Sequence, residues 1–213
     1  MGYVNTIKML KDLGADVNTP NKNGATPVWI AAQNGHGNTI KMLKDLEADI
    51  NTQTLLGATP VWIAAQNGHG NTIKMLKDLG ADVNTPKSHG ATPVWIAAQQ
   101  GHADTISVLK KLGANVNAPM DDGRTPVWIA AQNGHADTII VLSKLGANVN
   151  TPEKFGATPV WIAAQQGHVD TIRVLAEKGA DVNTPMKDGC TPVVIAAQND
   201  HQDVVNVLIE YGA

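Results

Sequence analysis

The tripeptide Thr-Pro-Val recurs six times along this chain, and every interval between successive copies is 33 residues. Each copy lies in a block close to GATPVWIAAQNGH, and no insertion or deletion separates the blocks. The copies begin at Thr26, Thr59, Thr92, Thr125, Thr158 and Thr191. Self-similarity at a fixed period of this length is the signature of a repeat architecture, in which one structural unit is stacked many times.

Each unit predicts two short helices followed by an extended turn. Thr26 is a residue type that caps helix N-termini, and Pro27 fits the first helical position, where no N–H is needed. We therefore expect a first helix over Val28–Gln33 that ends at Gly35. The spacing of apolar residues predicts a second helix over about Asn38–Leu46.

Helices of this length are marginal in isolation, and one unit cannot bury its own apolar face. Stacking of similar units solves both problems, so the sequence predicts a solenoid. We expect one all-α domain over residues 1–213, built from helix-turn-helix units. Its predicted parts are an N-terminal half repeat (1–20), five full repeats (21–53, 54–86, 87–119, 120–152, 153–185) and a C-terminal capping repeat (186–213).

The motifs Thr-Pro-x-x-x-Ala-Ala, Gly-His and Gly-Ala-Asp-Val-Asn recur in phase with the period of 33. In this pattern the chain resembles the ankyrin repeat family over essentially its whole length. The resemblance implies paired antiparallel helices, with β-turn fingers that project at one edge. It also implies a concave face, formed by the fingers and the first helices, that binds other proteins.

One column departs from the family, which usually has His after Thr-Pro-Leu. Five of the six units carry Trp there instead: Trp29, Trp62, Trp95, Trp128 and Trp161. Each indole either fills space between repeats, with its N–H bonded to a turn carbonyl, or lines the floor of a binding groove. A Gln four residues later shares the same helix face. The candidate groove residues are Trp62, Trp95, Trp128, Gln66, Gln99 and Gln132.

The units differ most at the finger tips. Leu55, Leu56 and Phe155 are apolar residues at positions where turns are usually polar. They lie near charged or titratable residues of neighbouring fingers, as in the rim of a protein-binding surface. We therefore predict a partner-binding rim formed by Leu55, Leu56, His89, Asp122, Arg124 and Phe155. The alternative is drift among recently duplicated units, with no partner selected.

Two further columns carry structural predictions. One His recurs in each unit, as in His36 and His69, so the rings lie about one helix spacing apart. They cannot converge on one metal ion, and we expect each to bond a turn. Glu47 occupies a position where the other units have Gly, which predicts a left-handed helix cap at that residue.

The sequence lacks the phosphate loops, dinucleotide fingerprints and nucleophile motifs of common enzymes, so we expect no catalysis, cofactor or metal site. The formal net charge of −3 gives no general attraction to nucleic acid. No apolar run reaches bilayer-spanning length, the first residues lack a signal-peptide core, and Cys190 is the single cysteine. These features favour a monomeric cytoplasmic protein.

The predicted function is a non-catalytic scaffold that binds a protein partner through the concave groove and the finger tips. One alternative is an engineered or structural repeat array without a natural partner. The near identity of the units favours recent duplication or design, whereas irregularities such as Glu47, Leu55-Leu56 and Gln53 favour a natural origin. Another is a fragment of a larger ankyrin-repeat protein.

Overall fold

The computed structural model describes residues 2–213, with side chains from residue 5 onward, and within that range the regular structure is entirely helical. Helix α1 (Gly2–Asp12) precedes the repeated helix pairs, and a 3-10 turn, η1 (Ser88–Gly90), lies between α5 and α6. The inner helices are α2 (Pro27–Gln33), α4 (Pro60–Gln66), α6 (Pro93–Gln99), α8 (Pro126–Gln132), α10 (Pro159–Gln165) and α12 (Pro192–Gln198). The outer helices are α3 (Gly37–Asp45), α5 (Gly70–Asp78), α7 (Ala103–Lys111), α9 (Ala136–Lys144), α11 (Val169–Glu177) and α13 (Gln202–Glu210).

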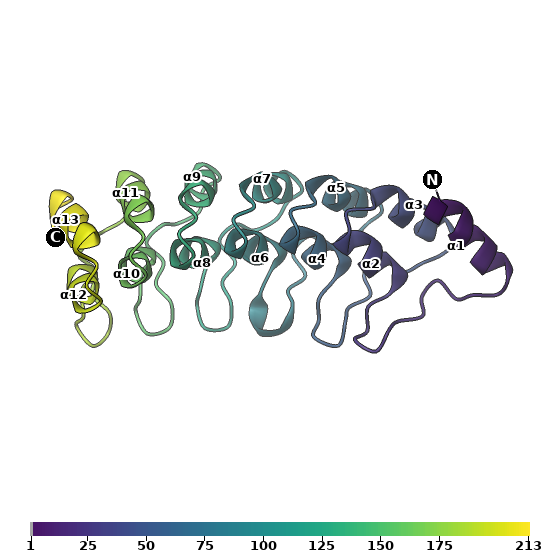
Figure 1. Ribbon diagram of the computed structural model, residues 1–213, viewed down its shortest axis with the longest axis horizontal. Helices are drawn as coiled ribbons and strands as arrows, with labels where there is room; N and C mark the ends of the chain where they lie inside the picture. Colours follow the sequence, from purple (N-terminus) through teal and green to yellow (C-terminus); the bar gives the residue numbers. More distant parts are fainter. Residues whose placement is uncertain (1) are drawn as a thin grey trace.

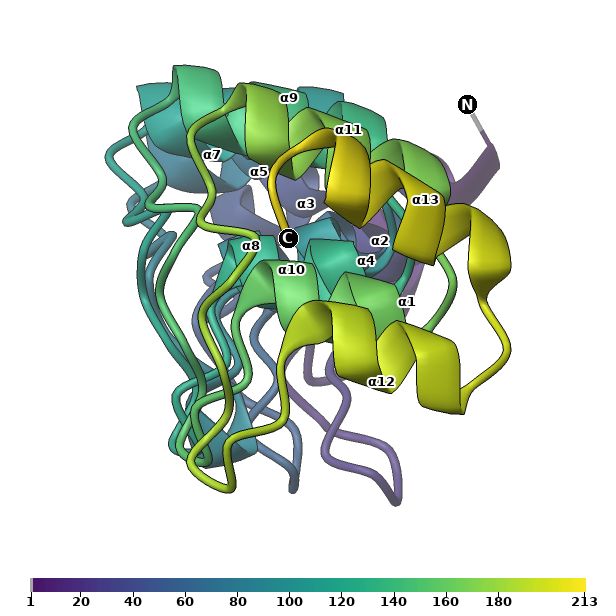
Figure 2. The ribbon, with the colours of Figure 1, turned by 90° about the vertical axis from the view of Figure 1, so that its left-hand side faces the viewer.

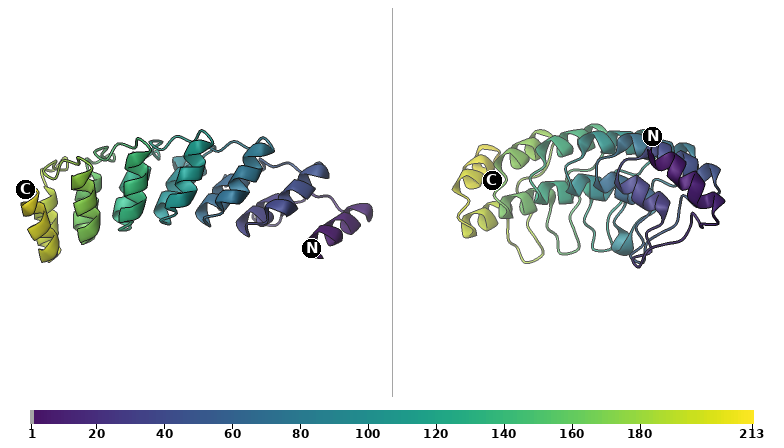
Figure 3. Two further views of the ribbon diagram at one scale, coloured as in Figure 1. Left: turned by 90° about the horizontal axis from the view of Figure 1, so that it is seen from above. Right: turned by 45° about the vertical axis from the view of Figure 1, so that its right-hand side comes forward.

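The helices form two layers, and each pair packs on the pairs before and after it. Figure 1 shows the inner layer beside the outer layer, with long loops projecting from the inner side. An end-on view shows these loops, which we call fingers, gathered along one edge of the stack (Figure 2). The stack curves along its length (Figure 3). The predicted all-α solenoid with projecting fingers is confirmed.

The local signals in the sequence act as expected at the helix ends. Thr59 caps α4 by accepting a hydrogen bond from the Trp62 N–H at 3.1 Å. The outer helix α3 begins at Gly37, one residue before the predicted start. Glu47 has a φ of +69°, in the region that Gly80 occupies at +96°, so the predicted left-handed cap is confirmed.

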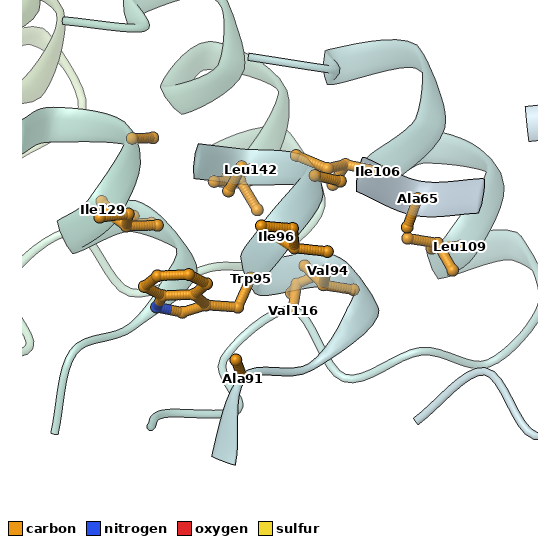
Figure 4. Close-up of a cluster of buried hydrophobic side chains, with 14 of the residues drawn as sticks. Ala65, Ala91, Val94, Trp95, Ile96, Ile106, Leu109, Val116, Ile129 and Leu142 are labelled. Atoms are coloured by element: carbon orange, nitrogen blue, oxygen red, sulfur yellow. The ribbon is translucent and has the colours of Figure 1, made fainter. Parts of the chain in front are cut away.

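The core lies between the two layers and between neighbouring repeats. Ile40, Leu43, Ile73 and Leu76 on the outer helices are almost completely buried, and the same two positions are buried in the next three repeats. The paired alanines of each inner helix let adjacent helices approach closely, since their side chains are small. Figure 4 shows such a cluster, in which Trp95, Ile129 and Leu142 come from different helices.

Hydrogen bonds tie each repeat to the next one. The His69 ring Nε2 lies 3.0 Å from the Gln33 carbonyl oxygen, and the equivalent contact joins His102, His135, His168 and His201 to the repeat before each. The prediction of a turn-bonding histidine is confirmed at these five positions. Fingers are joined as well, because the Leu55 N–H donates to the Asn23 carbonyl at 3.1 Å.

The structure adds two left-handed residues that the sequence analysis did not predict, His89 at φ +63° and Asp200 at φ +59°. Asp200 stands where the other Gly-His pairs have Gly. A Cβ placed on Gly35 would lie 3.0 Å from the His69 ring, so interior repeats require Gly there. Asp200 belongs to the final repeat of the described chain, where no further histidine ring packs on that position.

Candidate binding groove

Two adjacent hollows lie between the fingers and the inner helices near the N-terminal end of the stack. The first hollow has a volume of about 700 Å³ and is lined mainly by α2, α4 and the first two fingers, including Trp29, Ile30 and Leu55. The second hollow has a volume of about 450 Å³ and extends to Trp95 on α6 and to Met120 on the following finger. The hollows share Leu56, Trp62, Gln66 and Lys87. We refer to the two together as the double hollow.

Apolar side chains at the finger tips are unusually exposed. Leu55 is 78% exposed, and Leu56 and Phe155 are each 63% exposed. Leu55 and Leu56 stand at the edge of the double hollow, whereas Phe155 lies on a later finger outside it. Exposed apolar residues that adjoin a hollow with an apolar floor mark a surface able to bury more area on binding.

The sequence left open whether the tryptophans fill space between repeats or line the groove, and Trp62 does both. Trp62 and Trp95 are at least nine-tenths buried, yet both line the double hollow. The Trp62 indole N–H donates to the Ala91 carbonyl of the next finger at 3.0 Å. Trp128 makes the equivalent bond, whereas the Trp95 indole nitrogen is buried without a hydrogen-bond partner in the described chain. The column therefore supports the groove floor and also bonds several of the fingers.

Some charged finger residues pair with each other, whereas Lys87 lies against an aromatic ring. Arg124 and Asp122 pair with each other, with the guanidinium Nε and Nη2 each 2.7 Å from one carboxylate oxygen. Arg124 also lies over the Trp128 ring at 5.6 Å. Lys87 instead places its ammonium 4.5 Å from the centre of the Trp62 ring, at the boundary between the two hollows. The His89 ring lies 3.9 Å from the exposed Asp121 carboxylate.

The structure brings about half of the predicted site residues into one place. The double hollow is lined by Leu55, Leu56, Trp62, Gln66, His89, Trp95 and Gln99. Asp122, Arg124, Trp128, Gln132 and Phe155 lie farther along the stack and outside its lining. The double hollow also contains four residues that were not predicted from the sequence: Lys87, Trp29, Ile30 and Met120. Their signal was weak, because Lys87 and Met120 are ordinary finger residues and Ile30 repeats in every unit.

The fold and its repeated contacts define a class of protein. A family model described as "Ankyrin repeats (3 copies)" matches residues 1–87, 79–153 and 146–213, so the chain belongs to the ankyrin repeat family. A solved structure, the human ASB11 ankyrin repeat domain, is 27% identical in sequence and superposes with a TM-score of 0.87. That similarity covers 100% of this chain and 94% of the other. A search of curated proteins gives no match.

Ankyrin repeats are generally protein-interaction modules, and the family is typically non-catalytic. Within residues 2–213, no helix combines the length and the apolar character that a bilayer crossing requires.

Proposed function

We propose that this chain is a non-catalytic scaffold that binds a protein partner through its concave groove and finger tips. The proposed contacts are the residues predicted from the sequence: Leu55, Leu56, His89, Asp122, Arg124 and Phe155 at the rim, with Trp62, Trp95, Trp128, Gln66, Gln99 and Gln132 in the groove. To these we add Lys87, because it lines both parts of the double hollow.

The observation that carries the proposal is the exposure of Leu55 and Leu56 beside an apolar hollow. Solvent-exposed leucines at a turn tip gain nothing for the fold of the isolated chain, whereas covering them with a partner buries apolar surface. Apolar side chains surrounded by polar groups are the arrangement found at protein interfaces. The half-buried glutamines of the inner helices add hydrogen-bonding groups along the same groove.

The proposal also covers the oligomeric state, the class of partner and the location of the protein. A monomer that binds protein, and neither nucleic acid nor membrane, fits the formal net charge of −3. A cytoplasmic location fits the single cysteine, Cys190, which has no partner for a disulfide within the chain. We also propose that residues 1–213 act as one repeat domain, with the divisions given above.

The experiment compares a finger-tip variant with a control in which an exposed apolar residue elsewhere is replaced in the same way. In the first, Leu55, Leu56 and Phe155 are replaced by Ser. In the control, Ile209 on the outer helix α13, which is 58% exposed, is replaced by Ser. Proteins captured from a lysate by the unaltered chain are quantified on each variant.

We expect the triple variant to lose a specific captured partner by at least about tenfold, because truncating even one interface hot spot costs about 2 kcal/mol or more. The Ile209→Ser control keeps the partner. Equal capture by both variants removes the finger tips from the site. Absence of any specific partner favours the alternative, a structural array without a natural partner.

A further inference from the structure

The double hollow carries one positive charge at its centre. Lys87 lines both hollows, and no carboxylate of the described chain lines either of them. On the next finger, Asp122 pairs with Arg124 and Asp121 lies 3.9 Å from the His89 ring. No carboxylate in the described part of the chain forms an ion pair with the Lys87 ammonium. A chain with a net negative charge therefore presents a locally cationic groove.

The position of Lys87 is specific to one finger. The equivalent residues of the other fingers are Asn21, Thr54, Met120, Glu153 and Met186. The Trp62 ring lies 4.5 Å from the Lys87 ammonium, and the side chain is half-buried. A cation held against an aromatic face loses less conformational freedom when it pairs with an anion. Partial burial also strengthens that pairing relative to a fully solvated surface pair.

Apolar side chains lie around Lys87, together with polar groups such as Gln66. Leu56 and Trp62 line both hollows beside it, and Leu55, Ile30 and Ile63 line the first hollow. Ile30 is among the residues that line this hollow. A ligand that places only a carboxylate at Lys87 would leave this apolar surface in water. A ligand that is only apolar would cover the ammonium without pairing it, which is costly.

The geometry points to a peptide segment of a partner protein that carries both bulky apolar side chains and an acidic residue. The apolar side chains occupy the two hollows, and the carboxylate pairs with the Lys87 ammonium between them. This inference rests on the proposed function, because it names the chemistry of the segment that the groove binds.

The test uses a displayed library of random 12-residue peptides, selected on the intact chain at about 0.15 M salt, where distant surface charges are screened. Selections run in parallel on the unaltered chain, on Lys87→Gln, and on the double variant Leu55→Ser, Leu56→Ser. Lys154→Gln is the matched control, since Lys154 is an exposed finger lysine outside both hollows. Thermal unfolding of each variant confirms that its fold is retained.

We expect the unaltered chain to enrich peptides that contain Asp or Glu together with Leu, Phe or Trp. For a selected peptide, Lys87→Gln weakens binding by about fivefold, which corresponds to about 1 kcal/mol. Lys154→Gln leaves the affinity unchanged. Replacing the acidic residue of the peptide by its amide gives the same loss on the unaltered chain and no further loss on Lys87→Gln, as a double-mutant cycle requires for a direct pair.

The outcomes separate this inference from the proposed function. If peptides bind in a manner that depends on Leu55 and Leu56, but acidic residues are not enriched and Lys87→Gln has no effect, the inference is wrong and the proposed function stands. If the unaltered chain enriches no peptide, both are contradicted.

Discussion

Residues 24–46 and 57–79 have the same 23-residue sequence, GATPVWIAAQNGHGNTIKMLKDL, but lie in different surroundings. Both copies form an inner and an outer helix with the same boundaries relative to the repeat. Thr26 and Thr59 cap the two inner helices in the same way. Local sequence therefore determines where these helices begin and end.

The two copies differ in burial. Ile30 is 40% exposed, whereas Ile63 is 4% exposed. Helix α4 has α2 and α6 as neighbours on its two sides, whereas the space before α2 is a hollow of about 640 Å³ that Ile30 and Ile7 line. Because the sequences are identical, the difference in burial comes from the neighbouring repeat. A residue column can thus be core in one repeat and binding surface in another.

The largest expected effect comes from truncating the isoleucine in each copy. We predict that Ile63→Ala lowers the free energy of unfolding by about 3 kcal/mol, since it leaves a cavity in a close-packed interface. Ile30→Ala is predicted to cost about 1 kcal/mol, because its side chain is already partly in water. Urea unfolding of the two variants provides the measurement, and equal losses would show that neighbour packing does not distinguish the copies.

A smaller difference is expected for the tryptophans. The Trp62 indole N–H donates to Ala91, whereas the Trp29 indole nitrogen is buried without a partner in the described structure. Trp62→Phe is predicted to destabilise the protein by about 1–2 kcal/mol, because the Ala91 carbonyl loses its donor. Trp29→Phe is predicted to be neutral or slightly stabilising, since it removes an unsatisfied donor. Thermal unfolding compares the pair; a greater loss for Trp29→Phe contradicts this assignment.

The smallest effect concerns the residue that follows each copy, Glu47 or Gly80. Both are left-handed, and a Cβ at Gly80 would meet no atom within 4 Å, so strain in the backbone is the main difference. We predict that Glu47→Gly stabilises the protein by about 1 kcal/mol and raises Tm by about 2–4 °C. Gly80→Glu should lower Tm by a similar amount. An unchanged or lower Tm for Glu47→Gly would rule out a costly cap.

Much of the fold could be predicted from the sequence because its signals are local and repeated. The Thr-Pro pairs, the glycines after the helices and the constant period determine the helices and their stacking. The role of Trp62 and Trp95 could not be decided in this way, because burial and hydrogen bonding depend on the adjacent finger. Lys87 was missed for the same reason: its importance arises from the Trp62 ring and the two hollows, which come from three repeats.

The left-handed Asp200 shows another limit of the sequence pattern. In an interior repeat the residue before the His must be Gly, because the histidine ring of the next repeat packs on it. In the last repeat of the described stack no such ring packs there, so Asp200 fits in the left-handed conformation. A repeat pattern alone treats every unit as equivalent, whereas the structure makes the units at the ends different.

The most direct test of the claim that neighbours determine burial is amide hydrogen exchange of the two identical segments in the unaltered chain. Fragments that extend to Glu47 or Gly80 differ in mass, so mass spectrometry distinguishes them. We predict that amides of α4 exchange at least about tenfold more slowly than those of α2, because α4 is packed on both sides. Equal protection of the two helices would contradict the account.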